Sequence, residues 1–305
     1  MTAIASAPRV LCLGEALVDL IPQQPLDQLP DARAFIPHFG GAVANVAVVA
    51  ARAGANVALA GGAGADAWGR WLRDRLEREG VEVSLFELIE GGQTPLALVA
   101  IDSSGEPSYE IYGEGIATVV HALADRLDDA VARAAALFVS SNTLVGERER
   151  AVTMRARELA LEQSKPVIVD PNLRLHRWRS DADAAGAANG CVPGALLVRA
   201  TAAEAQLMTG AADPDRAARA LVAAGARAVV ITLGPDGAIL RGELHADVPG
   251  VRAEVISTVG AGDALTGLLL ARLALASFDP AALQSALPDA VEASARACER
   301  WGALE

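Results

Sequence analysis

The sequence predicts an α/β protein whose mostly parallel sheet is covered by helices on both faces. Short apolar runs of strand length alternate along the chain with longer stretches of helical period, which is the rhythm of a parallel sheet with crossover helices. Hydrophobic residues make up 52% of the chain, enough for a large buried core. A length of 305 residues fits one large domain, or a domain with a small appendage.

The first part of the chain supplies a strand, a helix, a second strand and a second helix. The expected elements are a strand at 9–14, an alternating stretch at 15–22, a helix opened by a glycine turn at 40–54, the strand NVALAGGAG and an amphipathic helix at 66–80. The segment 94–115 differs, because two alternating strands flank the turn SSGE, as in a hairpin. Together with 15–37 this hairpin is expected to form a small sheet apart from the main body.

From about residue 116 the alternation of helix and strand resumes. Its expected elements are a helix, the strand ALFVSSN, a helix at 147–164, the strand KPVIVDPNLR, a strand–turn–strand unit at 231–240, a strand leading through GAGD into a long apolar helix, and a closing helix at 285–301.

Composition excludes several classes of function. The formal net charge of −12 argues against nucleic-acid binding, which needs a basic surface. The three cysteines show no metal-ligand spacing and suit a reducing cytosol. No basic region followed by a long apolar run opens the chain, and charged residues interrupt the alanine-rich stretches before membrane-spanning length. We therefore expect a soluble, cytoplasmic protein without a membrane partner.

The stretch STVGAGDALTGLL at 257–269 has the clearest chemical potential. A glycine-rich turn that opens a helix exposes free backbone N–H groups, and the helix dipole adds positive potential, so an anion can bind there. Asp263 could simply cap its own helix. Alternatively, a carboxylate beside an anion hole can accept a hydroxyl proton during phosphoryl transfer.

Other polar residues allow both a structural and a functional interpretation. Asp170 and Asn172 could form a turn, and Arg174 could be a surface charge, yet DPNLR ends a strand where open α/β sheets bind ligands. Asn45 could be satisfied locally within its helix. Glu204 could be a first-turn acid stabilised by the helix dipole. The remaining candidates are Asp19 in an apolar strand, the glycines of FGGAVAN, and the turn in ITLGPDGAIL, which an ordinary hairpin explains.

Two nucleotide-binding motifs are excluded. The chain contains no GxxxxGK[ST] phosphate loop, and the spacing in GGAGADAWG does not fit a dinucleotide-binding turn.

Taken together and in this order, FGGAVANVA, DPNLR, TLGPDG and STVGAGDALTG resemble the ribokinase-like sugar kinases of the PfkB family. Within it, GEALVD, DPNLR with the following Trp178, and the TPLALV hairpin are similar to the fructokinase and 2-keto-3-deoxygluconate kinase branch. The resemblance implies a three-layer α/β/α core with a mostly parallel sheet, formed by 1–14, 38–93 and 116–305. It also implies a small β-sheet lid, formed by 15–37 and 94–115.

The resemblance also implies a role for each motif in an ATP-dependent, Mg²⁺-assisted transfer to a sugar hydroxyl. Asp263 would be the general base, and Glu204 would organise Mg²⁺ through water. The anion hole would be formed by Gly260, Ala261 and Gly262 with Asp263. The ATP site would be bordered by Thr232, Gly234, Gly237, Gly260 and Gly262. The sugar would be held by Asp19, Gly40, Gly41, Asn45, Asn172 and Arg174. In relatives the lid pairs with a second copy, so a homodimer through the lid is implied.

Three positions depart from the family pattern. Ser257 stands where the family has an acid that helps to form a monovalent-cation site, so K⁺ is doubtful as a cofactor. Thr201 replaces an asparagine three residues before the metal-organising glutamate. Gly113 follows Tyr112 where the lid often has arginine. A sugar acid would need that guanidinium, so a neutral, fructose-like sugar is favoured, although Arg174 could substitute.

Three alternatives stay open. The first is a 2-keto-3-deoxygluconate kinase. The second is a nucleoside kinase, which would need an aromatic clamp from Phe35, Phe39 or Tyr112. The third is a sugar- or nucleotide-sensing protein on the same fold that transfers nothing.

Overall fold

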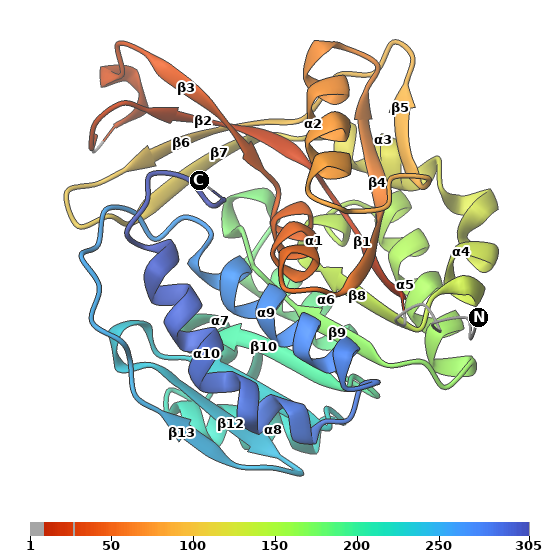
Figure 1. The fold of residues 1–305 in the computed structure, drawn as a ribbon, viewed down its shortest axis with the longest axis vertical. Coiled ribbons are helices and arrows are strands. Elements are labelled where there is room, and N and C mark those ends of the chain that lie inside the picture. The colour runs from red at the N-terminus through yellow and green to blue at the C-terminus, as the bar shows by residue number, and fades with distance from the viewer. Residues whose placement is uncertain (1–8, 27, 305) are drawn as a thin grey trace, which may run out of the picture.

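The large sheet of the protein forms the centre of the molecule (Figure 1). The computed structural model describes residues 9–26 and 28–304, so the parts of the expected core and lid at 1–8, 27 and 305 lie outside the described residues. Within the described residues the sheet has nine strands in the order β13-β12-β11-β10-β9-β8-β1-β4-β5. These strands are β1 (Arg9–Leu13), β4 (Asn56–Gly64), β5 (Phe86–Ile89), β8 (Ala136–Ser140), β9 (Val167–Asp170), β10 (Leu197–Thr201), β11 (Ala228–Thr232), β12 (Ala238–Gly242) and β13 (Ala246–Val248).

Neighbouring strands from β5 through β11 are parallel, and β12 and β13 add an antiparallel edge. Every residue of β8 and β9 is buried, as expected for strands covered on both faces. The predicted parallel α/β sheet is therefore confirmed, and so is the predicted hairpin at 231–240, which is formed by β11 and β12.

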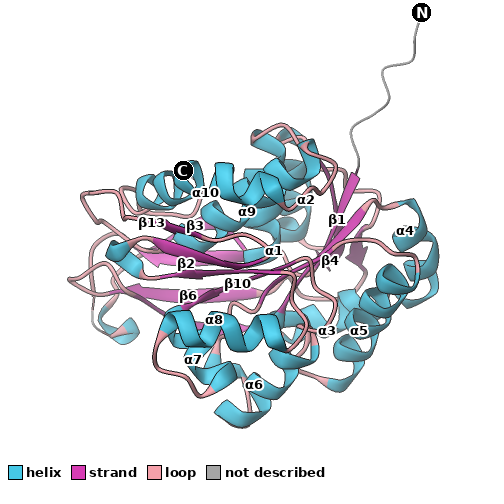
Figure 2. Ribbon diagram, turned by 90° about the horizontal axis from the view of Figure 1, so that it is seen from below, coloured by secondary structure: helices cyan, strands magenta, loops and turns pink. Residues whose placement is uncertain are grey.

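Helices cover both faces of this sheet. Figure 2 shows α2, α9 and α10 on one side and α6, α7 and α8 on the other, which gives three layers. The helices are α1 (Ala42–Arg52), α2 (Ala67–Arg78), α3 (Glu114–His121), α4 (Leu127–Arg133), α5 (Glu147–Glu162), α6 (Asp181–Gly190), α7 (Ala202–Thr209), α8 (Pro214–Ala223), α9 (Ala261–Leu275) and α10 (Ala281–Ala297). Among the described residues, no helix combines the length and the apolar character that crossing a membrane requires.

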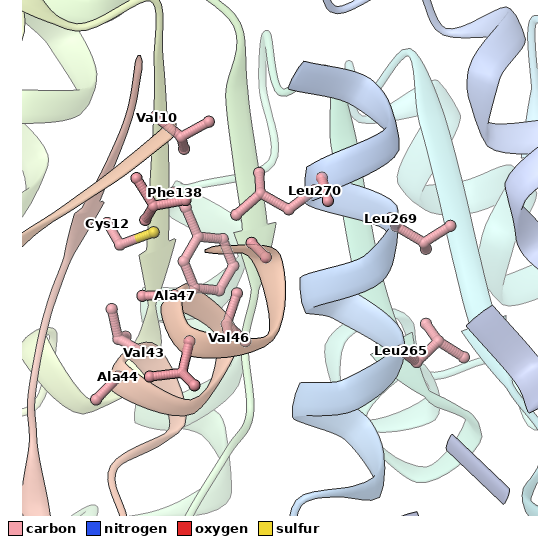
Figure 3. Packing of buried hydrophobic residues seen from close by; sticks show 14 of the residues in the cluster. Val10, Cys12, Val43, Ala44, Val46, Ala47, Phe138, Leu265, Leu269 and Leu270 are labelled. Atoms are coloured by element: carbon pink, nitrogen blue, oxygen red, sulfur yellow. The ribbon is translucent and has the colours of Figure 1, made fainter. Parts of the chain in front are cut away.

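The core fixes α9 against the sheet through α1. Figure 3 shows that α1 lies between two parts of the core. On one side are the strands that carry Cys12 and Phe138, and on the other is helix α9, which carries Leu270. The two helices approach closely because Gly267 faces α1, where a Cβ atom would lie 2.6 Å from the Cβ of Val49. The apolar face of α9 thus holds its first turn, with Asp263, in a fixed position at the edge of the sheet.

A second, four-stranded sheet lies apart from the large one, as predicted (Figure 1). Its strands have the order β3-β2-β6-β7 and comprise β2 (Leu17–Pro22), β3 (Phe35–Gly40), β6 (Leu96–Ile101) and β7 (Pro107–Tyr112). The predicted boundary at 37 falls inside β3, because this strand continues to Gly40, which pairs with Leu17. The small sheet therefore brings both Asp19 and Gly40 next to the large one.

Two sequence-based expectations about the end of the chain were wrong. No strand leads into GAGD, because the backbone N–H groups of Ile256 and Ser257 donate to the carbonyl of Cys298, and that of Thr258 donates to Gly105. These bonds tie the segment to α10 and to the β6–β7 turn instead of to a sheet. The closing helix spans Ala281–Ala297 instead of 285–301, since Asp279 accepts the N–H of Ala281 and begins it earlier.

The carboxyl ends of the central strands meet at one edge of the large sheet. In the strand register, Ser140 of β8 lies opposite Asp170 of β9, and Thr201 of β10 lies opposite Thr232 of β11. Side chains that end parallel strands are therefore collected at this edge, where open α/β sheets bind ligands.

Candidate active site

Two cavities meet at this edge of the large sheet. A small recess of about 30 Å³ lies toward the small sheet, and a cleft of about 1540 Å³ lies over the ends of β10 and β11. Both are lined by Tyr109, Arg174, Gly260 and Asp263. Asp263 therefore lies where the two cavities adjoin.

The Asp263 carboxylate does not cap its own helix. Its Oδ2 accepts a 2.8 Å hydrogen bond from Nδ2 of Asn45 on α1, and Asn172 Nδ2 lies 3.5 Å from its Oδ1. The residue before α9, Gly260, likewise makes no side-chain cap. The capping interpretation of GAGD is thus wrong, and the carboxylate is held at the junction of the two cavities by residues distant in sequence.

The environment of Asp263 favours a proton on the carboxylate. Burial, together with the charge of nearby Asp170, raises the pKa of Asp263 to about 7, although the Asn45 hydrogen bond and the guanidinium groups of Arg174 and Arg199 oppose this. A carboxylate with a pKa near 7 is well matched to accept a proton at neutral pH.

The first turn of α9 presents free backbone donors. The N–H groups of Gly260, Gly262 and Asp263 have no hydrogen-bond partner among the described residues, whereas that of Ala261 donates to the Thr258 carbonyl at 3.2 Å. Gly260 has a φ of +78°, and a Cβ there would lie 2.5 Å from Ala303, so only glycine fits. This turn can bind an anion through its free amides and the helix dipole.

The predicted sugar-binding residues gather around the recess. Asp19, Gly41 and Asn45 line it, and Gly40 lies against the Asp19 carboxylate. Burial raises the pKa of Asp19 to about 7, as do the charges of Asp263 and Glu15, while Arg174 lowers it. Asn45 Oδ1 is buried without a hydrogen-bond partner in the described part of the chain. These groups are buried acceptors for ligand hydroxyls.

We predict that Gly41→Ala destabilises the protein by about 1–3 kcal/mol more than Gly54→Ala. Both glycines have positive φ angles, +96° and +93°, so both variants bear the left-handed penalty. Only at Gly41 would the new Cβ meet backbone, 2.8 Å from the Glu15 carbonyl, whereas Gly54 has nothing within 4 Å. Unfolding in urea measures both free energies, and equal losses would contradict this.

The DPNLR segment contributes side chains to both cavities. Asn172, in the left-handed region with a φ of +40°, reaches Asp263, and Arg174 lines both cavities and stacks on the Tyr109 ring at 4.6 Å. Asp170 accepts a 2.6 Å hydrogen bond from Thr266 of α9. The motif is therefore more than a turn, because it connects β9 to the helix that carries Asp263.

The predicted nucleotide-binding residues line the cleft. Thr232, Gly234 and Gly237 form its wall in the β11–β12 turn. Glu204 also lines it, but both carboxylate oxygens already serve the fold: Oε1 accepts from the backbone N–H of Leu173, and Oε2 accepts from that of Thr201 as part of a capping box. Oε2 also accepts from the Thr201 hydroxyl at 3.0 Å, so Oε1 is the oxygen that keeps a lone pair for a water molecule.

Two buried charged residues that line the cavities were not predicted from the sequence. Arg199 lies in β10, 6% exposed, where its Nη1 is 3.3 Å from Asp170 Oδ2 and its Nη2 donates to Thr232. Glu15 follows β1, is fully buried and lines the recess. The available signal for Arg199 was a lone arginine within the apolar run LLVRA. A charged side chain is buried in such a run only when it is paired.

This arrangement can bring a hydroxyl and an anionic group together at one carboxylate. A hydroxyl in the recess would face Asp263, which can accept its proton. An anionic group in the cleft would face the free amides of α9 and the Arg199 guanidinium. No group of three or more His, Cys, Asp or Glu side chains that could hold a metal ion occurs among the described residues.

Residues 7–305 match the pfkB family of carbohydrate kinases. The chain belongs to this family. The predicted family and fold, and with them the enzyme class of carbohydrate kinase, are therefore confirmed.

Relatives of this pfkB family kinase agree with that assignment. The chain is 32% identical over 278 residues to Fructokinase-1 of Zea mays, covering 90% of this chain and 85% of the relative. A fructokinase double mutant from Vibrio cholerae, bound to fructose, ADP and potassium, has a TM-score of 0.83 at 27% identity, covering 98% and 94% of the two chains. Aminoimidazole riboside kinase from Salmonella enterica, with its riboside and an ATP analogue, has a TM-score of 0.79 at 26% identity, covering 97% and 95%.

Proposed function

We propose that this pfkB family kinase transfers the γ-phosphoryl group of ATP to a hydroxymethyl group of a fructose-like ketose. The observation that carries the proposal is the position of Asp263, whose carboxylate lines both the recess and the cleft next to the free amides of α9. One substrate on each side would place the hydroxyl, the base and the phosphoryl group in contact.

In the proposed step, the sugar hydroxyl oxygen forms a bond to the γ-phosphorus while Asp263 takes its proton. The bond between that phosphorus and the bridging oxygen breaks, and ADP leaves with the bonding electrons. The amides of Gly260, Gly262 and Asp263 would stabilise charge on the transferring group. Asn45 and Asn172 would orient the carboxylate.

The acceptor is assigned from the chemistry of the recess and from the relatives. Oxygen atoms of Asp19, Asn45 and Asp263 can accept hydrogen bonds from the hydroxyls of a neutral sugar. The same sugar would also be held by Gly40, Gly41, Asn172 and Arg174. Fructose is the sugar in the V. cholerae structure, and the maize relative is named fructokinase.

The nucleotide is assigned to the cleft. Thr232, Gly234 and Gly237 would border its phosphates, and the apolar side chains of Val251, Val291 and Ala295 would face the purine. Mg²⁺ would accompany the phosphates and neutralise part of their charge. Glu204 fits this role through water, since it lines the cleft and its Oε1 keeps a free lone pair.

The small sheet would act as a lid. The recess is bordered by Asp19 of β2, Ala97 of β6 and Tyr109 of β7, so this sheet would cover a bound sugar and exclude water from it. We propose that the lid also forms a homodimer contact and that the enzyme acts in the cytoplasm. The buried Ser257 hydroxyl accepts the N–H of Val259, so K⁺ stays outside the proposal.

The alternatives are less well supported by the described residues. A nucleoside kinase would need an aromatic clamp, yet Phe39 packs on Trp71, Tyr112 is 62% exposed, and Tyr109 of the recess already stacks on Arg174. A 2-keto-3-deoxygluconate kinase would rely on Arg174 for the carboxylate. A sensing protein would not need a carboxylate poised between two cavities.

A single assay of ADP formation tests these alternatives. We expect the highest kcat/KM with fructose, compared with 2-keto-3-deoxygluconate, ribose and adenosine, and little ADP without a sugar. Faster turnover of the sugar acid or of adenosine would assign the corresponding kinase. Binding of a sugar by calorimetry, without ADP formation from any acceptor, would contradict the proposed transfer.

A further inference from the structure

Glu15 is the carboxylate of the recess to which nothing above gives a role. It follows β1 and Gly14, is 0% exposed, and lines the recess together with Asp19 and Asp263. A fully buried acid at the carboxyl end of a central strand is costly unless its oxygens have hydrogen-bond donors.

Only one of its two oxygens has such donors among the described residues. Oε1 accepts from the backbone N–H of Ala42 at 3.0 Å and from Asn142 Nδ2 at 2.8 Å. Oε2 is buried and has no partner in the described part of the chain. The side chain is therefore fixed by Oε1, and Oε2 is left to be satisfied by something that enters the recess.

Arg177 secures this arrangement from behind. Its Nη1 donates to Asn142 Oδ1 at 2.9 Å, which orients the Asn142 amide so that Nδ2 faces Glu15. Burial lowers the pKa of Arg177, and the charges of Glu15 and Glu149 oppose this. A Cβ at Gly113 would lie 3.6 Å from Arg177 Nη2, so this guanidinium lies beside the lid position that lacks arginine. It contacts Asn142 and does not line the recess.

We propose that Glu15 Oε2 accepts a hydrogen bond from a hydroxyl of the acceptor sugar, which makes Glu15 a specificity-determining residue. This inference rests on the proposed function. Among its described lining residues the recess has three carboxylates, on Glu15, Asp19 and Asp263, and one guanidinium, on Arg174. Hydroxyl groups can donate to all three, whereas the carboxylate of a sugar acid would be repelled. Glu15 therefore selects a neutral, polyhydroxylated sugar over sugar acids and deoxy sugars.

The test is a set of binding measurements with Glu15→Gln. Glutamine keeps the Oε1 acceptor for Ala42 and Asn142 but removes the charge from the Oε2 position. Calorimetry would give the Kd of fructose, of its 1-, 3-, 4- and 6-deoxy analogues, and of 2,5-anhydromannitol, which lacks the 2-hydroxyl. We expect a loss of about tenfold for fructose, because a hydrogen bond to a charged group becomes a neutral one. For the analogue that lacks the paired hydroxyl, we expect the two proteins to differ by less than about twofold.

The matched control is Glu149→Gln. Glu149 is also buried, 4% exposed, but its Oε1 accepts the N–H of Gly146 at the start of α5 and it does not line the recess. This variant should bind fructose as the wild type does. If Glu15→Gln weakened the binding of fructose and of every analogue equally, or weakened the binding of none of them, the inference would be overturned. Fructose turnover by the wild type would leave the proposed function standing in that case, whereas a wild type that phosphorylates no sugar would contradict the function itself.

Discussion

Replacing Asp263 by asparagine is expected to lower kcat for the responsive sugar by about a hundredfold to ten-thousandfold, because the general base is lost. The fold should persist, since the asparagine oxygen can still accept the 2.8 Å hydrogen bond from Asn45. Steady-state kinetics of ADP formation measure the effect. A loss of less than about tenfold would show that Asp263 is not the base.

The same variant is expected to be more stable than the wild type above pH 7. The folded pKa of Asp263 is raised by burial to about 7, above its ordinary value of 3.8. The acid therefore contributes stability that is complete below about pH 4 and is lost as the pH rises through 7. Asparagine cannot ionise, so its advantage should grow between pH 4 and pH 7 and stay constant above, at no more than about 4 kcal/mol.

Urea unfolding at pH 5 and pH 8 checks this sign. The matched control is Asp74→Asn, which removes one carboxylate from an exposed position on α2 and should change neither turnover nor, by more than about 0.5 kcal/mol, the free energy of unfolding. If Asp263→Asn were less stable than the wild type at pH 8, the carboxylate would be stabilised in its ionised form, and the raised pKa would be wrong.

The α/β class and the position of GAGD could be predicted because both depend on local pattern. The buried strands β8 and β9 are apolar up to their last residue, and the turn GAGD is followed by the long apolar stretch of α9. The segment before GAGD is apolar too, yet it is no strand. Its backbone donors bond to Cys298, some forty residues further along the chain, and local sequence does not record such a contact.

The candidate site was predicted only as far as single motifs carry a signal. Asn45 and Asp263 were both selected, but their hydrogen bond joins residues 218 positions apart and decides that Asp263 is not a cap. Glu15 and Arg199 were missed, because an isolated charge in an apolar stretch gives no indication of its partner. Burial and an unpaired Oε2 make Glu15 a candidate only once the fold is known.

Asp170→Asn is expected to destabilise the protein by about 3–5 kcal/mol, because it leaves the buried Arg199 guanidinium without its counter-charge. Asp170 and Arg199 side chains are 3% and 7% exposed, and Arg199 Nε has no partner among the described residues, so little else compensates the charge. Burial raises the pKa of Asp170, whereas Arg199 and the Thr266 hydroxyl lower it. Because both donate to the carboxylate, we take it to be ionised at neutral pH.

Urea unfolding of this variant should be compared with Glu243→Gln, which breaks an exposed ion pair. Arg227 and Glu243 are each 51% exposed, so this control should cost less than about 1 kcal/mol. Adding Arg199→Met to Asp170→Asn removes the uncompensated charge and should recover part of the lost stability, which a double-mutant cycle would measure. Asp170 also raises the pKa of Asp263. The acidic limb of the pH profile of kcat/KM should therefore move to lower pH in Asp170→Asn. Losses as small as those of Glu243→Gln, with an unmoved acidic limb, would mean that the pair neither holds β9, β10 and α9 together nor tunes the base.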